Sequence, residues 1–176
     1  MEISNYWWSS GAQTGGDPGD PIGQSLRFRG GGTAPTSNTY LSRALTANNT
    51  FTLSVWLKLD VNEQYSAYMG NYSGGCRLFL SGSNNIYYTL DVYLSNTQTV
   101  AYNNIFLRDP SAWYHLVINS SSADARSRCW INGQEVTTGT PGAGSLWTGA
   151  TCYIGNGGPG VGGWTFRGYA AEQYYI

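Results

Sequence analysis

Hydrophobic and polar residues alternate one by one in the stretch 51–59. The apolar side chains stand at every second position and are Phe51, Leu53, Val55, Leu57 and Leu59. The positions between them hold Thr52, Ser54, Trp56 and Lys58. Because successive side chains of a strand point to opposite faces of a sheet, this pattern predicts a strand with one face on the core. Its length and its continuous apolar face predict a central strand.

The same alternation recurs at short intervals along the chain. Leu26 and Phe28 alternate with two arginines, and Leu116 and Ile118 share one face of the stretch 113–119. Further strands are predicted at residues 67–70, 77–80, 86–93, 97–102, 128–131, 152–155 and 166–176. Many short strands at regular spacing, with no sustained helical pattern, predict an all-β fold, a two-sheet antiparallel β-sandwich.

Two details refine this prediction. The dipeptide Asn132-Gly133 follows one predicted strand. This pair favours a two-residue type I′ turn, which needs a positive φ at both positions, so we expect a tight hairpin there. Trp56, Trp113 and Trp130 lie on predicted strands, and we expect all three to belong to the core.

The first 24 residues do not follow the strand pattern. Three aromatic residues, Tyr6, Trp7 and Trp8, precede the run "GGDPGDPIG", whose glycines and prolines prevent regular structure. We therefore divide the chain into an N-terminal arm, residues 1–24, and a sandwich domain, residues 25–176. We expect the arm to attach the protein to a neighbouring chain through its three rings. The alternative is that these rings cover the protein's own sandwich.

Length and charge limit the classes of partner. The chain has 176 residues, which is enough for one domain with a sizeable core. Charged residues make up 11% of the chain and the net charge is −1, so we expect neither a nucleic-acid partner nor an electrostatic membrane anchor. Nowhere does the sequence hold the roughly 18 apolar residues that a spanning helix requires. We expect no membrane insertion.

Six segments together resemble one family of sandwich domains. They are "SLRFRGGG", "FTLSVWLKLD", "WYHLVINSS", "CWINGQEV", "YIGN" and "FRGYAAEQYYI". Their order and approximate spacing are similar to those of the laminin-G-like, concanavalin-A-like jelly roll, and the resemblance covers residues 25–176. The start "NYWW" and the stretch "YLSRALTANNTFTLSVWLK" further resemble modules in structural proteins of marine bacteriophages.

That resemblance implies a non-enzymatic component of a virion. Such a protein would lie on the particle surface or tail, as part of a tail fibre, a spike or the capsid surface. Its partners would be other virion proteins and further copies of itself, in a homo-oligomer. The alternative is a carbohydrate-binding adhesion module that recognises host-surface glycans. The two functions predict different surfaces, because assembly needs an apolar patch and adhesion needs aromatic rings beside polar groups.

Catalysis has little support in the sequence. Jelly-roll glucanases similar to this fold place two carboxylates on one strand, and no two Asp or Glu residues here are two positions apart. His115, the only histidine, could join a triad assembled from distant segments. "WYHLV", however, resembles the core strand of the family, so we expect a structural histidine. The run from Gly158 to Gly163 has the glycine spacing of a dinucleotide-binding motif. That motif must be followed by a helix, however, and here a strand is predicted to follow. We expect no enzyme.

The sequence also offers few metal ligands. Calcium is the usual cofactor of similar sandwich domains, but the densest acidic pair, Asp17 and Asp20, is typical of a turn. We expect no cofactor, with calcium as the alternative. Cys76, Cys129 and Cys152 are expected to be ordinary thiols, the alternative being a bridge between the last two.

Three aromatic residues in loops are the candidates for glycan contact. Trp147 and Trp164 lie in glycine-rich loops, and Tyr72 lies in a loop with other tyrosines. Exposed rings can stack on sugar faces while neighbouring polar groups supply specificity. The alternative is that these rings belong to the core or to an interface.

Overall fold

The computed structural model shows a sandwich of antiparallel strands. It describes residues 5–6, 25–29, 40–44, 48–59, 68–70, 78–82, 88–94, 97–100, 106–138, 140–145, 151–155 and 166–176. The strands are β1 (Asn5–Tyr6), β2 (Leu26–Arg29), β3 (Leu41–Ala44), β4 (Phe51–Leu59), β5 (Met69–Gly70), β6 (Leu78–Gly82), β7 (Tyr88–Leu94), β8 (Thr97–Val100), β9 (Phe106–Leu107), β10 (Trp113–Ser121), β11 (Arg126–Ile131), β12 (Gln134–Glu135), β13 (Thr151–Ile154) and β14 (Arg167–Tyr175).

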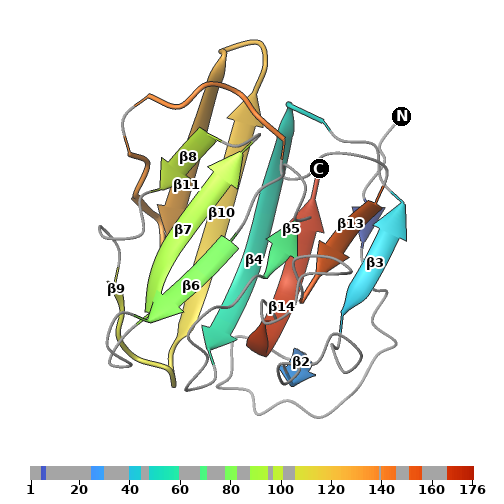
Figure 1. Cartoon of the computed structure of the whole chain (residues 1–176), viewed down its shortest axis with the longest axis vertical. Coiled ribbons are helices and arrows are strands. Elements are labelled where there is room, and N and C mark those ends of the chain that lie inside the picture. Colours follow the sequence, from blue (N-terminus) through green and yellow to red (C-terminus); the bar gives the residue numbers. More distant parts are fainter. Residues whose placement is uncertain are drawn as a thin grey trace.

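A seven-stranded sheet forms one layer of the sandwich. Its order is β1-β14-β4-β10-β11-β12, with β2 also paired to β14, and we call it the large sheet. The second layer, in front of it in Figure 1, contains the sheet β3-β13-β5 and the sheet β6-β7-β8, in which β9 also pairs with β7. All pairings are antiparallel. The predicted sandwich is therefore confirmed, and its second layer is divided into two sheets.

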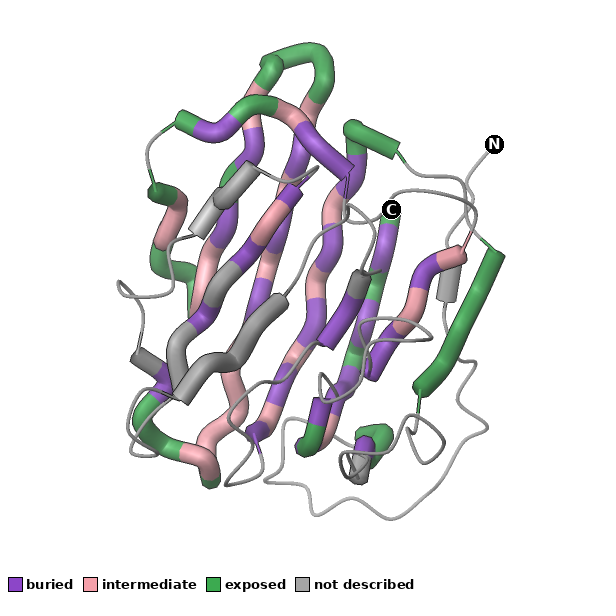
Figure 2. The backbone as a smooth tube through the Cα atoms, viewed as in Figure 1, coloured by how far each residue is buried: buried purple, intermediate pink, exposed green. Residues whose placement is uncertain are grey.

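The hydrophobic core lies between the two layers. Along β4, buried and half-buried residues alternate strictly, as the sequence predicts (Figure 2). The predicted core residues Leu53, Val55, Leu116 and Ile118 are at most 1% exposed and belong to one continuous cluster. Phe28 and Phe166 close this cluster near β2, with their ring centroids 5.6 Å apart. The assignment of the inward face of both central strands is confirmed.

The hairpin between β11 and β12 has the predicted turn. Asn132 has a φ of 49° and Gly133 a φ of 79°, which is the pair of positive values that a type I′ turn needs. The side chain of Asn132 also accepts a hydrogen bond from the backbone N–H of His115, at 2.8 Å. The turn therefore fixes the end of the large sheet and holds the neighbouring part of β10.

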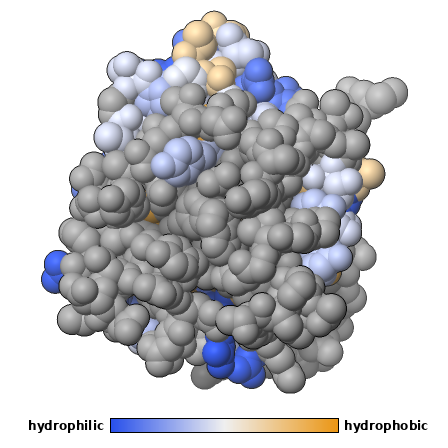
Figure 3. Space-filling model, viewed as in Figure 1, coloured by the Kyte–Doolittle hydropathy of each residue, from blue (hydrophilic) through white to orange (hydrophobic). Residues whose placement is uncertain are grey.

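The turn that joins β10 to β11 lies at the top of the molecule in Figures 1 and 3. Its residues 122–125 are all exposed. Figure 3 shows hydrophobic and hydrophilic atoms mixed there, with no continuous apolar patch on this turn.

Strand β3 is an element that the sequence did not reveal. Its four residues are all exposed, and among the described strands it pairs with β13 at the edge of its sheet. A strand without an inward face has no hydrophobic alternation, so no period of two marks it in the sequence.

The N-terminal segment contributes a short edge strand. Asn5 pairs with Tyr175 and Tyr6 pairs with Tyr174, which places two residues of the expected arm on the edge of the large sheet. A sheet edge offers unpaired N–H and C=O groups, and an added strand satisfies them. Trp7, Trp8 and the rest of residues 1–24 lie outside the described residues, as does the side chain of Tyr6.

Two of the three cysteines lie in different layers. Cys129 is on β11 and Cys152 on β13, and both are fully buried free thiols. The alternative of a bridge between them is therefore wrong. Burial raises the pKa of both thiols far above the ordinary value. Cys76 lies outside the described residues.

Candidate functional site

The outward face of the large sheet gathers aromatic and basic side chains. Lys58 on β4 lies opposite Trp113 on β10 and opposite Tyr169 on β14. Tyr169 in turn lies opposite Arg27 on β2. These four residues form one row across four adjacent strands, Arg27–Tyr169–Lys58–Trp113, which we call the outer row. Since neighbouring strands are about 4.8 Å apart, the row is about 14 Å long.

The side chains of the outer row contact one another. The guanidinium carbon of Arg27 stands 5.5 Å from the ring centroid of Tyr169, in the geometry of a cation–π contact. The rings of Tyr169 and Trp113 meet edge to face across β4, with centroids 6.5 Å apart. Lys58 lies between these rings in the register, and all three are half-buried. The row is therefore a packed surface that still presents part of each ring to solvent.

A second aromatic pair lies next to the outer row. Trp56 and His115 are opposite each other on β4 and β10, and their rings stack at 4.7 Å with an angle of 18° between the planes. On the other side of Trp56 lies Ala171, which is fully buried although it precedes a bulge in β14. Two further residues of the face, Asn119 and Thr52, share a hydrogen bond of 3.0 Å.

His115 has the contacts of a structural residue. Its Nε2 atom lies 2.9 Å from the hydroxyl of Ser54, and its ring stacks on Trp56. A serine and a histidine in contact are two of the three members of a catalytic triad. The third member is a carboxylate that orients the imidazole. Among the described residues, no Asp or Glu side chain hydrogen-bonds His115. The contact with Ser54 and the stack on Trp56 orient the imidazole of His115. The imidazole is then a polar group on the flat outward surface of the sheet.

The loop before β10 positions Trp113, which is the residue that β10 contributes to the outer row. The side chain of Asp109 accepts hydrogen bonds from the backbone N–H and the hydroxyl of Ser111, at 2.8 and 2.6 Å. These bonds lower the pKa of Asp109, with smaller contributions from the Ala112 N–H and the charge of Lys58. The Tyr114 hydroxyl accepts a hydrogen bond from the backbone N–H of Asp109 and donates one to its backbone carbonyl, both at 3.0 Å. This turn fixes where β10, and with it Trp113, begins.

The expectation that three tryptophans are core residues is wrong. Trp56, Trp113 and Trp130 are half-buried and occupy outward positions of the large sheet. The alternation already carried this information, because Trp56 has the same parity as Lys58 and the opposite parity to Leu57. A position on a strand does not place a side chain in the core, because every second side chain of a strand faces outward.

The glycan-contact candidates from the sequence, Trp147, Trp164 and Tyr72, lie outside the described residues. The same is true of Asp17 and Asp20, the pair considered for calcium. Within the described part of the chain, no three His, Cys, Asp or Glu side chains come together as a metal site would require. The described residues also include no helix long and apolar enough to cross a membrane.

A family model matches most of the chain. The model of the concanavalin A-like lectin/glucanases superfamily, laminin G type, matches residues 30–172. No curated protein matches the sequence of this chain.

Solved structures with the same fold are distant in sequence. A native heptameric SAP-like pentraxin from Limulus polyphemus has 17% identity and a TM-score of 0.58, over 86% of this chain and 74% of the pentraxin chain. Domain 4 of an extracellular arabinanase from Geobacillus stearothermophilus, in complex with arabinotriose, has 17% identity and a TM-score of 0.54, over 88% and 82% of the two chains. Botulinum neurotoxin type C, whose cell entry depends on two ganglioside molecules, has 9% identity and a TM-score of 0.52, over 86% of this chain and 39% of the toxin chain. At these identities the similarity is one of fold.

Proposed function

Because the chain belongs to the concanavalin A-like lectin/glucanases superfamily, we propose that it is a carbohydrate-binding module without catalytic activity. The observation that carries this proposal is the outer row, in which Tyr169 and Trp113 present partly exposed rings on adjacent parts of a rigid sheet. Aromatic rings offer an apolar face to the C–H groups of a sugar ring, and rings held on strands are already in position before the ligand arrives.

Polar groups beside the rings could supply the hydrogen bonds of such a site. Ser54 and His115 already hydrogen-bond each other next to Trp56, and Asn119 lies on the same face. Specificity in ligand sites comes from a few fixed polar groups of this kind among apolar surface. The arabinanase domain and the neurotoxin, which have the same fold, are described with a sugar ligand and with gangliosides, and this makes glycans the first ligand class to test.

The absence of catalysis is part of the proposal. It is supported by the whole sequence, in which no two carboxylates are two positions apart on one strand. It is also supported by the surroundings of His115, where the described residues provide no orienting carboxylate.

A glycan array tests the proposed function. Trp113→Ala should lower the affinity for the bound glycan at least about tenfold, as the loss of a central aromatic contact does. Trp56→Ala should have a similar effect. Tyr40→Ala is the matched control, because Tyr40 is 42% exposed and precedes β3 in the second layer. Unchanged binding in both tryptophan variants, with unchanged circular dichroism, would rule out the outer row as the site. Trp147→Ala and Trp164→Ala on the same array test the loop candidates.

We further propose that the module is displayed on a virion, on its surface or tail, beside other virion proteins and copies of itself. The support is the resemblance of the "NYWW" start and of the stretch "YLSRALTANNTFTLSVWLK" to phage structural modules. Removal of residues 1–24 is the test. Lost incorporation into particles with an unchanged melting temperature supports a role of this segment in assembly, whereas a large fall in melting temperature with intact assembly counts against it.

A further inference from the structure

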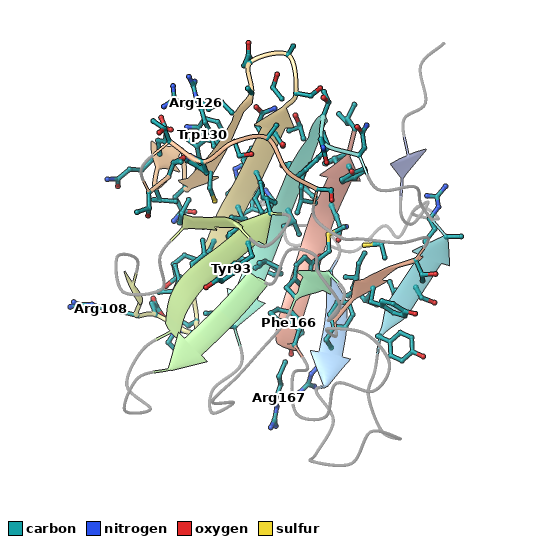
Figure 4. The ribbon with its side chains drawn as sticks, turned by 45° about the horizontal axis from the view of Figure 1, so that its top comes forward. Tyr93, Arg108, Arg126, Trp130, Phe166 and Arg167 are labelled. Carbon is teal, nitrogen blue, oxygen red and sulfur yellow. The ribbon has the colours of Figure 1, made fainter. Side chains whose placement is uncertain are left out.

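Positive charge is concentrated on the outward face of the large sheet. The whole chain has nine Lys and Arg and ten Asp and Glu, with a net charge of −1. Strand register and burial place five of these cations at outward positions of the sheet, and they are Arg27, Lys58, Arg126, Arg128 and Arg167. Figure 4 shows Arg126 on β11 and Arg167 at the start of β14, at opposite ends of the sheet. The charge is therefore spread along the face and continues through the outer row.

Among the residues that the structure describes, few acidic side chains lie on this face. Among the described residues, Glu135 lies opposite Trp130 on β12, and Glu172 is exposed at the bulge of β14. Asp109 lies near Lys58, where the lysine helps to lower its pKa, although hydrogen bonds from Ser111 contribute more. The other described acid with a known exposure, Asp124, is in the exposed turn after β10. Counted over the described side chains, the face therefore carries more cations than acids, in a chain whose overall charge is −1.

Cations and rings alternate along the outer row. Arg27 is exposed and lies over Tyr169, and Lys58 stands between Tyr169 and Trp113. A polysaccharide lying along this row would place its sugar faces on the rings. Acidic groups at the edges of the sugars would then meet the guanidinium or the ammonium group. A neutral polysaccharide would use the rings and leave both cations without a counterpart in the ligand.

We propose that the ligand of this face is an anionic polysaccharide, whose carboxylate or sulfate groups are bound by Arg27 and Lys58 between the rings of the outer row. This inference rests on the proposed function and adds the chemical class of the glycan. A single-stranded nucleic acid also combines stackable rings with negative charge. The polysaccharide is favoured because the chain belongs to a lectin superfamily and has a net charge of −1, where nucleic-acid-binding domains are strongly basic.

The test compares pairs of polysaccharides that differ chiefly in charge. The probes are polygalacturonate with its neutral methyl ester, and chondroitin sulfate with its desulfated form, which keeps its uronate carboxylates. Each is titrated at roughly 0.05 M and roughly 0.5 M NaCl to vary the screening. The protein should bind the more charged member of each pair more tightly than the less charged one, and the preference should shrink at high salt. Lys58→Gln and Arg27→Gln should each reduce this preference about two- to fivefold, as exposed ion pairs do. Arg43→Gln, which removes the same charge from exposed strand β3, is the matched control and should leave the preference unchanged.

The outcomes separate this inference from the proposed function. Equal affinity for the more and the less charged member of each pair, with loss of both in Trp113→Ala, would overturn the anionic class and leave glycan binding intact. Binding of both members that survives in Trp113→Ala and Trp56→Ala would overturn the site itself. Tighter binding to single-stranded DNA than to either anionic polysaccharide would overturn the class of ligand, and no binding to any of the four polysaccharides would count against both proposals.

Discussion

An alanine at position 144 should destabilise the fold because Gly144 lies directly against the end of β7. A Cβ atom there would stand 2.8 Å from the Cβ of Leu94 and 3.0 Å from its carbonyl carbon and oxygen. Two of these three atoms belong to the backbone, so relief requires the segment 140–145 and the strand to separate. The N–H of Gly144 also donates a hydrogen bond of 3.0 Å to the buried hydroxyl of Ser120, which that movement would weaken. Overpacking of this kind costs about 1–3 kcal/mol.

Gly142→Ala is the matched control for this change. A Cβ atom at Gly142 would approach only the backbone oxygen of Ala125, at 4.0 Å. Glycine-to-alanine changes at such open positions stabilise by about 0.4–1 kcal/mol, because they restrict the unfolded chain. Urea unfolding of both variants measures the difference in free energy, and each kcal/mol corresponds to about 2–4 °C in melting temperature for a chain of this length. Equal stability of the two variants would refute the close contact between this segment and β7.

Three further predictions concern stability and activity. Leu53→Ala should lower the free energy of unfolding by about 2–5 kcal/mol, because Leu53 is 1% exposed in the core, and a loss below about 1 kcal/mol would contradict that placement. Stability should fall in alkali, because burial raises the pKa of Cys129, Cys152 and Tyr68 in the folded state. The stabilisation that these groups contribute is fully present below the ordinary thiol pKa of 9.0, and it is lost as the pH rises from there toward their raised pKa values in the folded state. A melting temperature that stays constant from pH 8 to pH 11 would contradict this prediction. Incubation with β-glucans, agar and bacterial polysaccharide should release no reducing sugar above a boiled control, and sustained release would show catalysis.

The bulge in β14 shapes the core next to the buried Tyr68. The register between β14 and β4 shifts after Ala171, where Glu172 has a φ of 48°. The shift turns Gln173 inward, where it accepts a hydrogen bond from the Tyr68 hydroxyl. The amide oxygen is thereby satisfied at a position that is 4% exposed, and the amide nitrogen lies 4.0 Å from the sulfur of Met69. Neither the bulge nor this pair has a signature in the sequence, because both depend on strands far apart in the chain.

The errors of sequence interpretation have two physical causes. Trp56 and Trp113 were expected in the core because they lie on strands, although their position in the alternation places them with Lys58 on the outward face. Strand β3 was missed because its side chains are all exposed and therefore show no alternation. In the first case the alternation already showed the outward position, and in the second there was no alternation to find.

The sequence by itself determined the elements that depend on local order. The period of two along β4 and β10 fixed which side chains face the core, and the Asn132-Gly133 pair fixed the turn after β11. Only the tertiary structure decided which outward side chains become neighbours. Arg27, Tyr169, Lys58 and Trp113 come from four separate stretches, and they form one row because β2, β14, β4 and β10 pair in that order and register. Alternation is a property of one strand, whereas a binding face is a property of the pairing between strands.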